Sequence, residues 1–476
     1  MKNVYLLKDT KYLKSKRTVL YKLNTNLNIP LHIQLYKAIK EEILSELQVG
    51  AKLPSIRKLV SQYNLSKTTV ESAYSQLYAE GFIESKPRSG YFVADVLYQN
   101  CPHRDTKDKS QTSQKKYKYD FFPAELKKED FPLKVWKRCF NKVIDETLDF
   151  GSYGDGQGES GLRDEIASYL TSLREVKCDS KQIIICSGFS DSMSLVAKLL
   201  KQKFSYFGME EPGYHIARRV FEEYGYNIKK IKVASEGVEL SSLKTSGAQF
   251  IYITPSHHYP TGVTMPISKR VKILEYINSI NGFIIEDDYD SELAYYNRPI
   301  PALQGIDIND RVIYMGTFAK SLSPALRISY MVLPKQLLSI YKMSYDAHFP
   351  RVSITTQKTL EVFMKEGHWE RHLRKIRTIN KKKHNLLKEL LSNYLKESFE
   401  IVAEGAGLAI LINPTVAFNW EKFKTLAEQE EIKLYFAKER CGGDFEAIRM
   451  GFGGFNENKL EEAIKVFTSI WYKSVL

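Results

Sequence analysis

The sequence has 476 residues, of which 43% are hydrophobic and 26% are charged, and its formal net charge at pH 7 is +14. This length and composition predict a globular protein of two or three domains and exclude a disordered chain. No apolar run is long enough to cross a bilayer, which excludes a membrane-spanning protein and predicts that no membrane is a partner. The charge is uneven, because residues 1–119 hold 21 Lys and Arg against 10 Asp and Glu. A polyanionic partner for this first quarter is therefore indicated.

The cysteines are few, odd in number and scattered, and none has the spacing of a metal site: Cys101, Cys139, Cys178, Cys186 and Cys441. No stretch resembles a signal peptide. Scattered, unpaired cysteines of this kind are typical of reduced thiols, so we expect a cytoplasmic protein without a structural metal.

The chain opens with an arm, residues 1–25, which is rich in Lys and Tyr and shows no clear period. Helical spacing then begins, with apolar residues at Leu31, Leu35, Ile39 and Ile43. Because the pattern changes there, we expect a separate domain to start near residue 26.

Two further helices and a hairpin complete the domain expected over residues 26–94. Ser55 and Ser66 each precede a helical pattern and are good N-cap residues. Short strands, 82–85 and 90–93, flank the basic turn Lys86-Pro87-Arg88-Ser89. Three helices followed by a basic hairpin predict a winged helix-turn-helix.

In such a domain the second helix of the turn enters the major groove of double-stranded DNA with its N-terminal residues nearest the bases. Lys67, Thr68 and Thr69 hold that position. Arg57 begins the preceding helix and could reach a phosphate, while Arg88 at the wing tip could reach the backbone or the minor groove. The competing interpretation is a winged helix that contacts only proteins.

Residues 95–118 are polar, basic and aperiodic, and we interpret them as a linker. In residues 119–476, short apolar runs alternate with amphipathic helical patterns. The strand-like runs are 183–186, 204–207, 250–253, 283–285 and 312–315. This alternation predicts an α/β domain with a mostly parallel sheet and ligands at the carboxyl ends of its strands. We expect a smaller α+β subdomain over about residues 375–476.

Residues suited to a phosphorylated, planar ligand follow these strands. Gly188, Phe189 and Ser190 open a helix whose free amides could bind phosphate. Tyr214 could stack on a ring, although ordinary packing is the commoner role of such a tyrosine. His257 and His258 lack a third metal ligand at suitable spacing, so we favour a structural role or a place at the ligand's edge.

Asp287 ends another strand, where a buried carboxylate is costly unless it meets a cation such as a protonated pyridine nitrogen. Tyr289 could donate to a phenolic oxygen on the same ring. A solvated acidic loop or a metal site is the alternative for this acidic stretch.

The most informative residue is Lys320, which follows the strand 312–315 among small and hydroxyl side chains. An amine at this position can form a Schiff base with an aldehyde cofactor. Thr317 and Arg327 flank it with a hydroxyl and a fixed positive charge, which suit a phosphate. Arg449 lies in an apolar stretch and needs an anion, either a substrate carboxylate or a structural partner.

The ordered motifs Leu53-Pro54-Ser55, Leu65–Val70, Glu80–Ile83 and Arg88–Val93 resemble the GntR family of bacterial regulators. The segment around Lys320 resembles the lysine motif of fold-type I pyridoxal-phosphate (PLP) enzymes. Together the two parts look like the MocR family, whose members bind PLP, regulate transcription and commonly form head-to-tail homodimers. GabR-like members respond to an amino compound as its aldimine with PLP, and PdxR-like members respond to PLP itself and control vitamin B6 synthesis.

Carried over residue by residue, the resemblance makes Lys320 the catalytic, PLP-linking lysine, Asp287 the partner of the pyridine nitrogen and Tyr289 the partner of the phenolic oxygen. Tyr214 becomes the stacking ring and Arg449 the carboxylate anchor. The phosphate position is assigned to Gly188, Phe189, Ser190, Thr317 and Arg327.

Two positions depart from the family pattern. Tyr259 stands where aminotransferases place Asn before Pro-Thr-Gly, which disfavours efficient transamination. Ile216 replaces the arginine of GabR-like proteins, which disfavours γ-aminobutyrate as ligand. We therefore expect a PLP-dependent regulator, with vitamin B6 synthesis as a candidate target. The alternatives are an active aminotransferase with an appended DNA-binding module and a regulator whose altered site binds another ligand.

Overall fold

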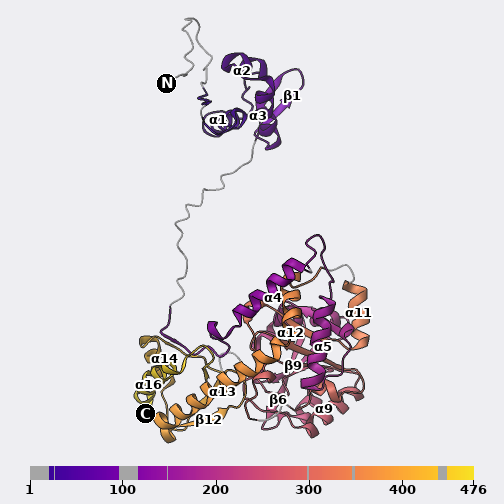
Figure 1. Cartoon of the computed structure of the whole chain (residues 1–476), viewed down its shortest axis with the longest axis vertical. Coiled ribbons are helices and arrows are strands. Elements are labelled where there is room, and N and C mark those ends of the chain that lie inside the picture. The colour runs from indigo at the N-terminus through magenta and orange to yellow at the C-terminus, as the bar shows by residue number, and fades with distance from the viewer. Residues whose placement is uncertain are drawn as a thin grey trace. The chain divides into compact units, whose positions relative to one another are not determined.

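A computed structural model describes residues 21–25, 27–95, 116–146, 148–296, 300–345, 349–437 and 447–476. These residues fall into two units, one on either side of residue 115 (Figure 1). Most of the expected arm (1–20), most of the expected linker (96–115), Cys101 and Cys441 lie outside the described residues. No helix in the described ranges is both long and apolar enough to span a membrane.

The N-terminal unit is a winged helix, as the sequence predicted. Its elements are α1 (Leu31–Ser45), α2 (Ile56–Tyr63), α3 (Lys67–Ala79), β1 (Ile83–Lys86) and β2 (Gly90–Val93). The two strands pair antiparallel, with Ile83 opposite Val93. Strand β1 begins one residue later than expected, because the Phe82 amide still donates to the Leu77 carbonyl at the end of α3.

Side-chain caps and one apolar cluster hold these helices. Ser55 accepts a hydrogen bond from the Lys58 amide (3.3 Å), and Ser66 accepts one from the Thr69 amide (3.1 Å), so both predicted caps form. Fully buried Tyr74 donates from its hydroxyl to the Pro54 carbonyl (2.7 Å), which ties α3 to the segment before α2. The unit therefore has its own core.

The C-terminal unit is built on an eight-stranded sheet of order β4-β11-β10-β9-β8-β5-β6-β7. Strands β10, β9, β8, β5 and β6 run parallel, whereas β11 is antiparallel to both neighbours and β7 is antiparallel to β6. Their bounds are β4 (Ile183–Cys186), β5 (Tyr206–Glu211), β6 (Asn227–Ala234), β7 (Gly237–Val238), β8 (Phe250–Ile253), β9 (Phe283–Asp288), β10 (Val312–Thr317) and β11 (Ser329–Val332).

All five expected strands are present, but the one expected over 204–207 was misplaced. Strand β5 begins at Tyr206, because the amides of Lys203 and Phe204 still donate to the Leu200 carbonyl at the end of the preceding helix. The phenyl ring of Phe204 is buried, so the apolar run marked a core position rather than the start of the strand.

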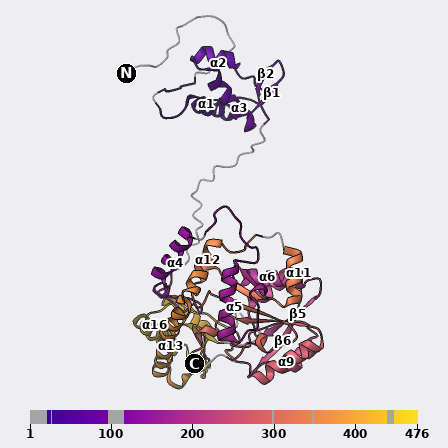
Figure 2. The same ribbon diagram turned by 45° about the vertical axis from the view of Figure 1, so that its right-hand side comes forward.

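Helices cover both faces of the sheet (Figures 1 and 2). Ile184 packs in one apolar cluster, while its neighbours Ile183 and Ile185 pack in another, as expected for a strand buried on both faces. The helices are α4 (Leu133–Glu146), α5 (Ser160–Arg174), α6 (Phe189–Leu200), α7 (His215–Glu223), α8 (Leu240–Ser246), α9 (Ile267–Ser279), α10 (Leu303–Ile306), α11 (Lys335–Tyr345) and α12 (Ile354–Lys365).

A smaller α+β part follows, as expected. The 28-residue helix α13 (His368–Leu395) leads into it, and residue 375 lies within that helix. An antiparallel sheet of order β12-β13-β15 packs with two helices, and a short parallel pair joins β14 to β3. The bounds are β3 (Tyr119–Asp120), β12 (Phe399–Ala403), β13 (Ala409–Pro414), α14 (Trp420–Gln429), β14 (Ile432–Lys433), β15 (Ile448–Gly451) and α16 (Glu457–Ser474).

Candidate functional site

The sheet topology gathers the candidate residues of the C-terminal unit. Lys320 lies three residues beyond β10, Asp287 lies near the end of the adjacent parallel strand β9, and Tyr214 lies three residues beyond β5. Because the carboxyl ends of parallel strands meet at one edge of a sheet, residues far apart in sequence converge there.

Lys320 is largely buried, with 19% of its side chain exposed. Its Nζ lies 3.7 Å from an Asp290 carboxylate oxygen and 4.1 Å from the centre of the Tyr289 ring. Burial, helped by the positive charge of Arg449, lowers the pKa of the Lys320 amine, although Asp290 opposes the shift. A lowered pKa keeps more of this amine neutral and therefore nucleophilic.

The carboxylates of the acidic run 286–288 have different hydrogen-bond partners. Asp288 accepts from Arg174 Nε and from the Tyr314 hydroxyl, both at 2.6 Å. Glu286 points to the same side of β9 and accepts from the amides of Leu303 and Gln304 (both 2.8 Å). These two carboxylates are already neutralised or hydrogen-bonded within the protein.

Asp287 points to the other side of β9, toward the lysine. It accepts from the Tyr252 hydroxyl (2.6 Å), and burial raises its pKa to about 7 despite that hydrogen bond and the charge of Lys320. A buried carboxylate that is reluctant to ionise is stabilised by a cation brought to it. This supports the choice of Asp287 as the partner of a pyridinium nitrogen.

The raised pKa of Asp287 predicts a pH-dependent stability. Because the folded protein holds this proton more tightly than the unfolded chain (ordinary value 3.8), the free energy of unfolding should fall as pH rises from about 4 to 7. In Asp287→Asn, the fall in unfolding free energy between pH 5 and pH 8 should be smaller than in wild type by on the order of 2 kcal/mol. Urea denaturation of the cofactor-free protein at the two pH values measures this difference. Asp145→Asn, at an exposed position on α4, is the control and should behave as wild type. An unchanged pH dependence in Asp287→Asn would contradict this account of the carboxyl group.

The expected phosphate residues gather at the start of α6. Gly188 has φ +83°, and a Cβ built there would lie 2.3 Å from Arg327 Nη2, so the guanidinium lies directly against this turn. Phe189 and Ser190 supply the first two helical positions, and Ser190 is exposed. Asp191 in the same turn is paired with Arg351 (2.8 Å). Thr317 accepts from the Ala319 amide (3.1 Å). Free amides beside a fixed cation form a suitable phosphate site.

Aromatic side chains line the space between these groups. Tyr214 packs edge-on against Phe189 and Tyr259, each with ring centres 5.1 Å apart. The Tyr289 hydroxyl lies 3.3 Å from His257 Nδ1. A flat ring placed among them would meet aromatic surface.

Sequence reasoning missed the part played by Asp290. Its carboxylate lies 2.9 Å from His257 Nδ1 and 3.7 Å from Lys320 Nζ. Burial disfavours its charge, but the charges of His257 and Lys320 together outweigh burial and lower the pKa of Asp290. The only signal in the sequence was that Asp290 lies within an acidic run. The inside–outside alternation of side chains along β9 could not single it out, because Asp290 lies beyond the end of that strand.

Arg449, on β15, comes to the same place from the small C-terminal part. Its Nη1 donates to the Tyr259 hydroxyl (2.5 Å), and its guanidinium lies 4.4 Å from the centre of that ring. The arginine is only 8% exposed, and its Nε has no hydrogen-bond partner in the described ranges. A buried donor of this kind calls for an acceptor, and a ligand carboxylate fits.

Some of these groups line one pocket: His257, Tyr259, Tyr289, Asp290, Lys320 and Arg449. Its remaining walls are mainly small or apolar side chains: Pro123, Pro260, Ala403, Ala406, Gly407, Leu408, Ala409 and Leu411. PLP needs an amine for its aldehyde, a carboxylate for its pyridine nitrogen, an aromatic ring to stack on and a cationic site for its phosphate. Lys320, Asp287, Tyr214 and the turn of Gly188 beside Arg327 provide these groups in that order. The side chains present therefore fit this cofactor.

In the N-terminal unit, the candidate DNA contacts lie on exposed positions. Lys67 and Thr68 begin α3 and are exposed, while Thr69 is half-buried and shares the Ser66 hydroxyl with Thr68 (2.7 and 2.9 Å). Arg57, at the start of α2, is exposed. Arg88 has φ +60° at the exposed tip of the wing. The start of α3 and the tip of the wing are therefore both exposed, as contact with a duplex requires.

Comparisons with known proteins match both units. Residues 123–467 match the family model of aminotransferase class I and II, and residues 31–93 match the model of bacterial regulatory proteins of the gntR family. The chain is 36% identical to the uncharacterized HTH-type transcriptional regulator YdeL of Bacillus subtilis, over 94% of this chain and 98% of that protein. It is 30% identical to the probable rhizopine catabolism regulatory protein MocR of Rhizobium meliloti, over 87% of each.

A more distant relative is the HTH-type pyridoxine biosynthesis transcriptional regulator PdxR of Corynebacterium glutamicum, at 25% identity over 78% of this chain and 80% of that protein. Among solved structures, the Pyrococcus horikoshii kynurenine aminotransferase in complex with PMP has a TM-score of 0.66 at 22% identity. That match covers 76% of this chain and 92% of the enzyme. At this identity the structural likeness establishes the fold alone.

Proposed function

Because the chain belongs to the aminotransferase class I and II family and carries the GntR-type domain of MocR-like transcriptional regulators, we propose that it is a DNA-binding regulator that senses PLP. The observation that carries this proposal is the largely buried amine of Lys320, which lies beside Tyr289 and Asp290 in one pocket with Arg449 and whose pKa is lowered by burial. A regulator of transcription works where the DNA is, so we place it in the cytoplasm.

Each side chain has a separate task in this proposal. When bound, PLP supplies an aldehyde carbon open to amines and a ring that withdraws electrons. Lys320 is the amine that holds that carbon, and Asp287 keeps a proton on the pyridine nitrogen. The Tyr289 hydroxyl donates to the phenolic oxygen, and the Tyr214 ring orients the pyridine.

The remaining groups hold the two ends of the bound molecules. Arg327 and Thr317, with the turn of Gly188, Phe189 and Ser190, hold the phosphate. Arg449 offers its unpartnered Nε to the carboxylate of an amino compound. Such a compound would be a second ligand of the same pocket.

The residue at position 259 disfavours turnover as an aminotransferase. At the position where aminotransferases have an asparagine amide, the Tyr259 hydroxyl instead accepts from Arg449. The side chain at this position is therefore engaged by the arginine and supplies no amide to the cofactor. This arrangement fits PLP as an effector better than PLP as the cofactor of a multiple-turnover reaction.

The same reasoning favours PLP itself as effector and vitamin B6 synthesis as the controlled process. Ile216, on α7, packs against the apolar core near Tyr214 and offers no second anchor for an anion. The relative PdxR is named as a pyridoxine biosynthesis regulator. Both observations support, for this chain, a link to B6 supply.

We further propose a homodimer, with the head-to-tail arrangement that the family resemblance implies. Large apolar side chains are exposed on the C-terminal unit, among them Phe150 (75%), Tyr153 (71%) and Phe349 (63%). The rings of Tyr153 and Phe349 contact each other, with centres 4.4 Å apart. Exposed aromatic groups of this size are typical of a surface covered by a partner. Light scattering should therefore give twice the mass of one chain.

The test of the proposed function is the affinity of the full-length protein for DNA upstream of its own gene, measured by fluorescence anisotropy with and without PLP. We expect PLP to change the dissociation constant by roughly 5- to 150-fold, the usual range of allosteric coupling. Pyridoxine 5′-phosphate, which has an alcohol in place of the aldehyde, is the matched control ligand and should have little effect.

Two outcomes would count against the proposal. Equal DNA affinity with and without PLP, at every salt concentration tried, would contradict PLP sensing. Absence of any salt-dependent DNA binding would contradict the assignment of Arg57, Lys67, Thr68, Thr69 and Arg88 as DNA contacts.

A further inference from the structure

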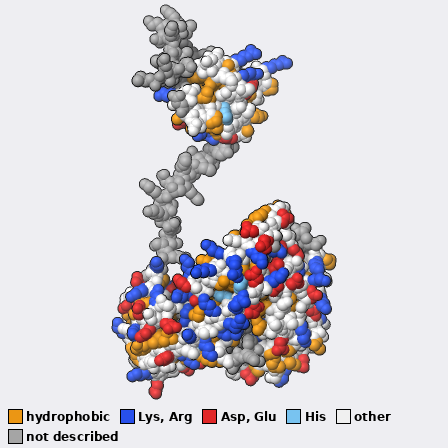
Figure 3. Space-filling view, viewed as in Figure 1, with side chains coloured by type: hydrophobic (Ala, Val, Ile, Leu, Met, Phe, Trp, Pro, Cys, Tyr) orange, Lys and Arg blue, Asp and Glu red, His pale blue; other side chains and the backbone are white. Residues whose placement is uncertain are grey.

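Positive charge in the C-terminal unit is concentrated on one helix. Helix α13 carries eight Lys and Arg against two Glu. The rest of the sequence beyond residue 119 carries 41 Lys and Arg against 44 Asp and Glu. Residues 120–476 are therefore slightly acidic apart from this helix, and Figure 3 shows Lys and Arg side chains gathered where Figure 1 places α13.

The cations of α13 face solvent in a row, which we call the α13 basic row: Arg371, Arg374, Lys375 and Lys382. All four are exposed. Arg374 and Lys375 lie three and four residues after Arg371, and Lys382 lies seven residues after Lys375, which puts them on one side of the helix. Within the described part of the chain, no carboxylate pairs with Arg374, Lys375 or Lys382. The row extends over about 16 Å at 1.5 Å per residue.

The N-terminal end of the row joins a second helix through an unusual junction. His368 Nδ1 lies 2.6 Å from Arg371 Nη2, and His368 Nε2 lies 2.7 Å from Arg138 Nη2 on α4. A neutral imidazole has one acceptor nitrogen, so it can accept from only one of these two guanidinium groups, although Arg371 Nη2 also donates to the Glu366 carbonyl (2.7 Å).

Negative charge at this junction is scarce. Glu366 contacts His368 (3.1 Å) and Lys142 (2.9 Å) and lies 3.8 Å from Arg138, so one carboxylate serves several cations. Lys134, Lys137 and Arg138 add exposed charge along α4. The excess of donors over acceptors here is relieved by an incoming anion.

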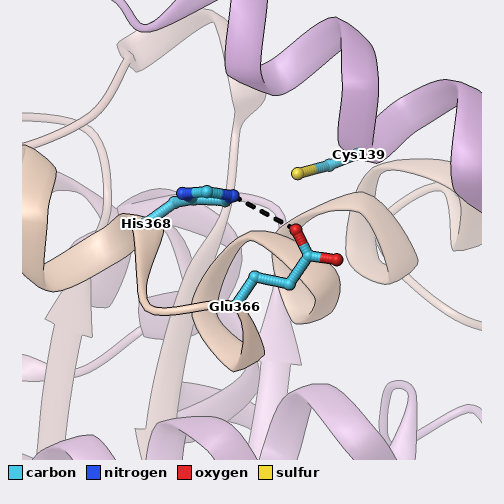
Figure 4. A group of neighbouring side chains, drawn as sticks. All are labelled: Cys139, Glu366 and His368. Atoms are coloured by element: carbon cyan, nitrogen blue, oxygen red, sulfur yellow. Dashed lines mark hydrogen bonds and ion pairs between the residues drawn. The ribbon is translucent and has the colours of Figure 1, made fainter.

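A metal ion does not fit the same place. Cys139, Glu366 and His368 bring one potential ligand atom each within 4.8 Å of one another (Figure 4). Burial, together with the charge of Glu366, raises the pKa of the Cys139 thiol, which disfavours the thiolate that a metal needs. Arg138 and Lys142 would also repel a cation. The charges at this junction therefore favour an anion over a metal ion.

We infer that the α13 basic row, continued by Arg138 on α4, binds the phosphate backbone of duplex DNA as a second contact, in addition to the winged helix. A row of exposed cations without carboxylate partners is the chemistry that recognises a backbone with one phosphate per ~1.7 Å of duplex axis. The GntR-type unit of the same chain keeps DNA at a high effective concentration near this surface. The alternative occupant of this row, an acidic protein segment, is distinguished by the experiment below.

The experiment compares the full-length protein with a triple variant, Arg374→Gln, Lys375→Gln and Lys382→Gln, on mixed-sequence duplexes of about one and about four helical turns, each turn having roughly 10 base pairs. These three residues lie outside the Glu366 network and outside the pocket, so the fold and PLP binding should be unaffected. The matched control, Lys272→Gln, Lys422→Gln and Lys459→Gln, removes the same charge from exposed positions on α9, α14 and α16.

On the long duplex, the triple variant should bind about tenfold or more weakly, and the slope of log affinity against log salt should be smaller in magnitude by about 2 to 3. On the short duplex, which the winged helix alone can cover, it should match wild type, and the control should match wild type on both. Wild-type affinity and slope of the triple variant on the long duplex would overturn the inference and leave an acidic protein as the occupant. Equal losses in the triple variant and the control would also overturn it, because net charge alone would then be the cause.

Discussion

Replacing Lys320 with alanine should abolish covalent attachment of PLP and remove the effect of PLP on DNA affinity, while DNA binding itself persists. Lys320 supplies the amine whose Nζ lies against Tyr289 and Asp290 in the pocket. Arg327, Gly188 and Asp287 remain in the variant, so weak non-covalent binding should survive. Visible absorbance before and after borohydride reduction measures attachment, and anisotropy with upstream DNA measures the response.

A matched lysine tests whether a low pKa is sufficient for attachment. Partial desolvation also lowers the pKa of Lys203, whose side chain is otherwise exposed and whose amine lies over the Phe283 ring (4.8 Å). This residue lies three residues beyond the C-terminal end of α6, whereas Gly188 lies at the other end of that helix. Lys203→Ala should therefore keep both attachment and response. A Lys320→Ala protein that binds PLP tightly and still changes its DNA affinity would show that sensing needs no covalent link.

The largest expected loss of stability follows from Arg174→Ala. Arg174 Nε donates to Asp288 at 2.6 Å, and the two side chains are 3% and 1% exposed. The other guanidinium nitrogens donate to the Ile300 carbonyl (3.0 Å) and the Ser256 hydroxyl (2.8 Å). Removing one partner leaves an uncompensated buried charge, which typically costs about 3–5 kcal/mol of unfolding free energy.

Tryptophan fluorescence during urea denaturation isolates this effect, because all four tryptophans, at positions 136, 369, 420 and 471, lie in the C-terminal unit. The control is Lys465→Ala, which removes an exposed partner of Glu461 (2.7 Å) and should cost less than about 1 kcal/mol. A loss of less than about 1 kcal/mol in Arg174→Ala would mean that Asp288 is not held as a buried charge.

Local chemistry explains what the sequence could predict of the fold. Ser55 and Ser66 cap their helices because a hydroxyl before a helix can accept from a free amide. Apolar runs located β4, β8 and β10 because strands covered on both faces are apolar throughout. Strand order and direction were not predictable in this way, since β11 lies between β4 and β10 and runs antiparallel to both.

In the candidate site too, some residues could be predicted from local patterns and others could not. Lys320, Asp287 and Tyr289 each follow or end a strand, so position within a local pattern pointed to them. The bond between Arg449 and Tyr259 joins residues 190 apart in the sequence. Nothing local marks such a pair, because the contact exists only once β15 packs beside the loop that follows β8. The pairing of Asp290 with His257, across 33 residues, was hidden for the same reason.

One measurement tests the central claim most directly. The purified protein is saturated with PLP, reduced with borohydride and digested, and the peptides are sequenced by mass spectrometry. The account predicts a single phosphopyridoxyl group, carried on Lys320 within the segment 316–327. A group attached to a different lysine, or no attached group in a correctly folded protein, would contradict it.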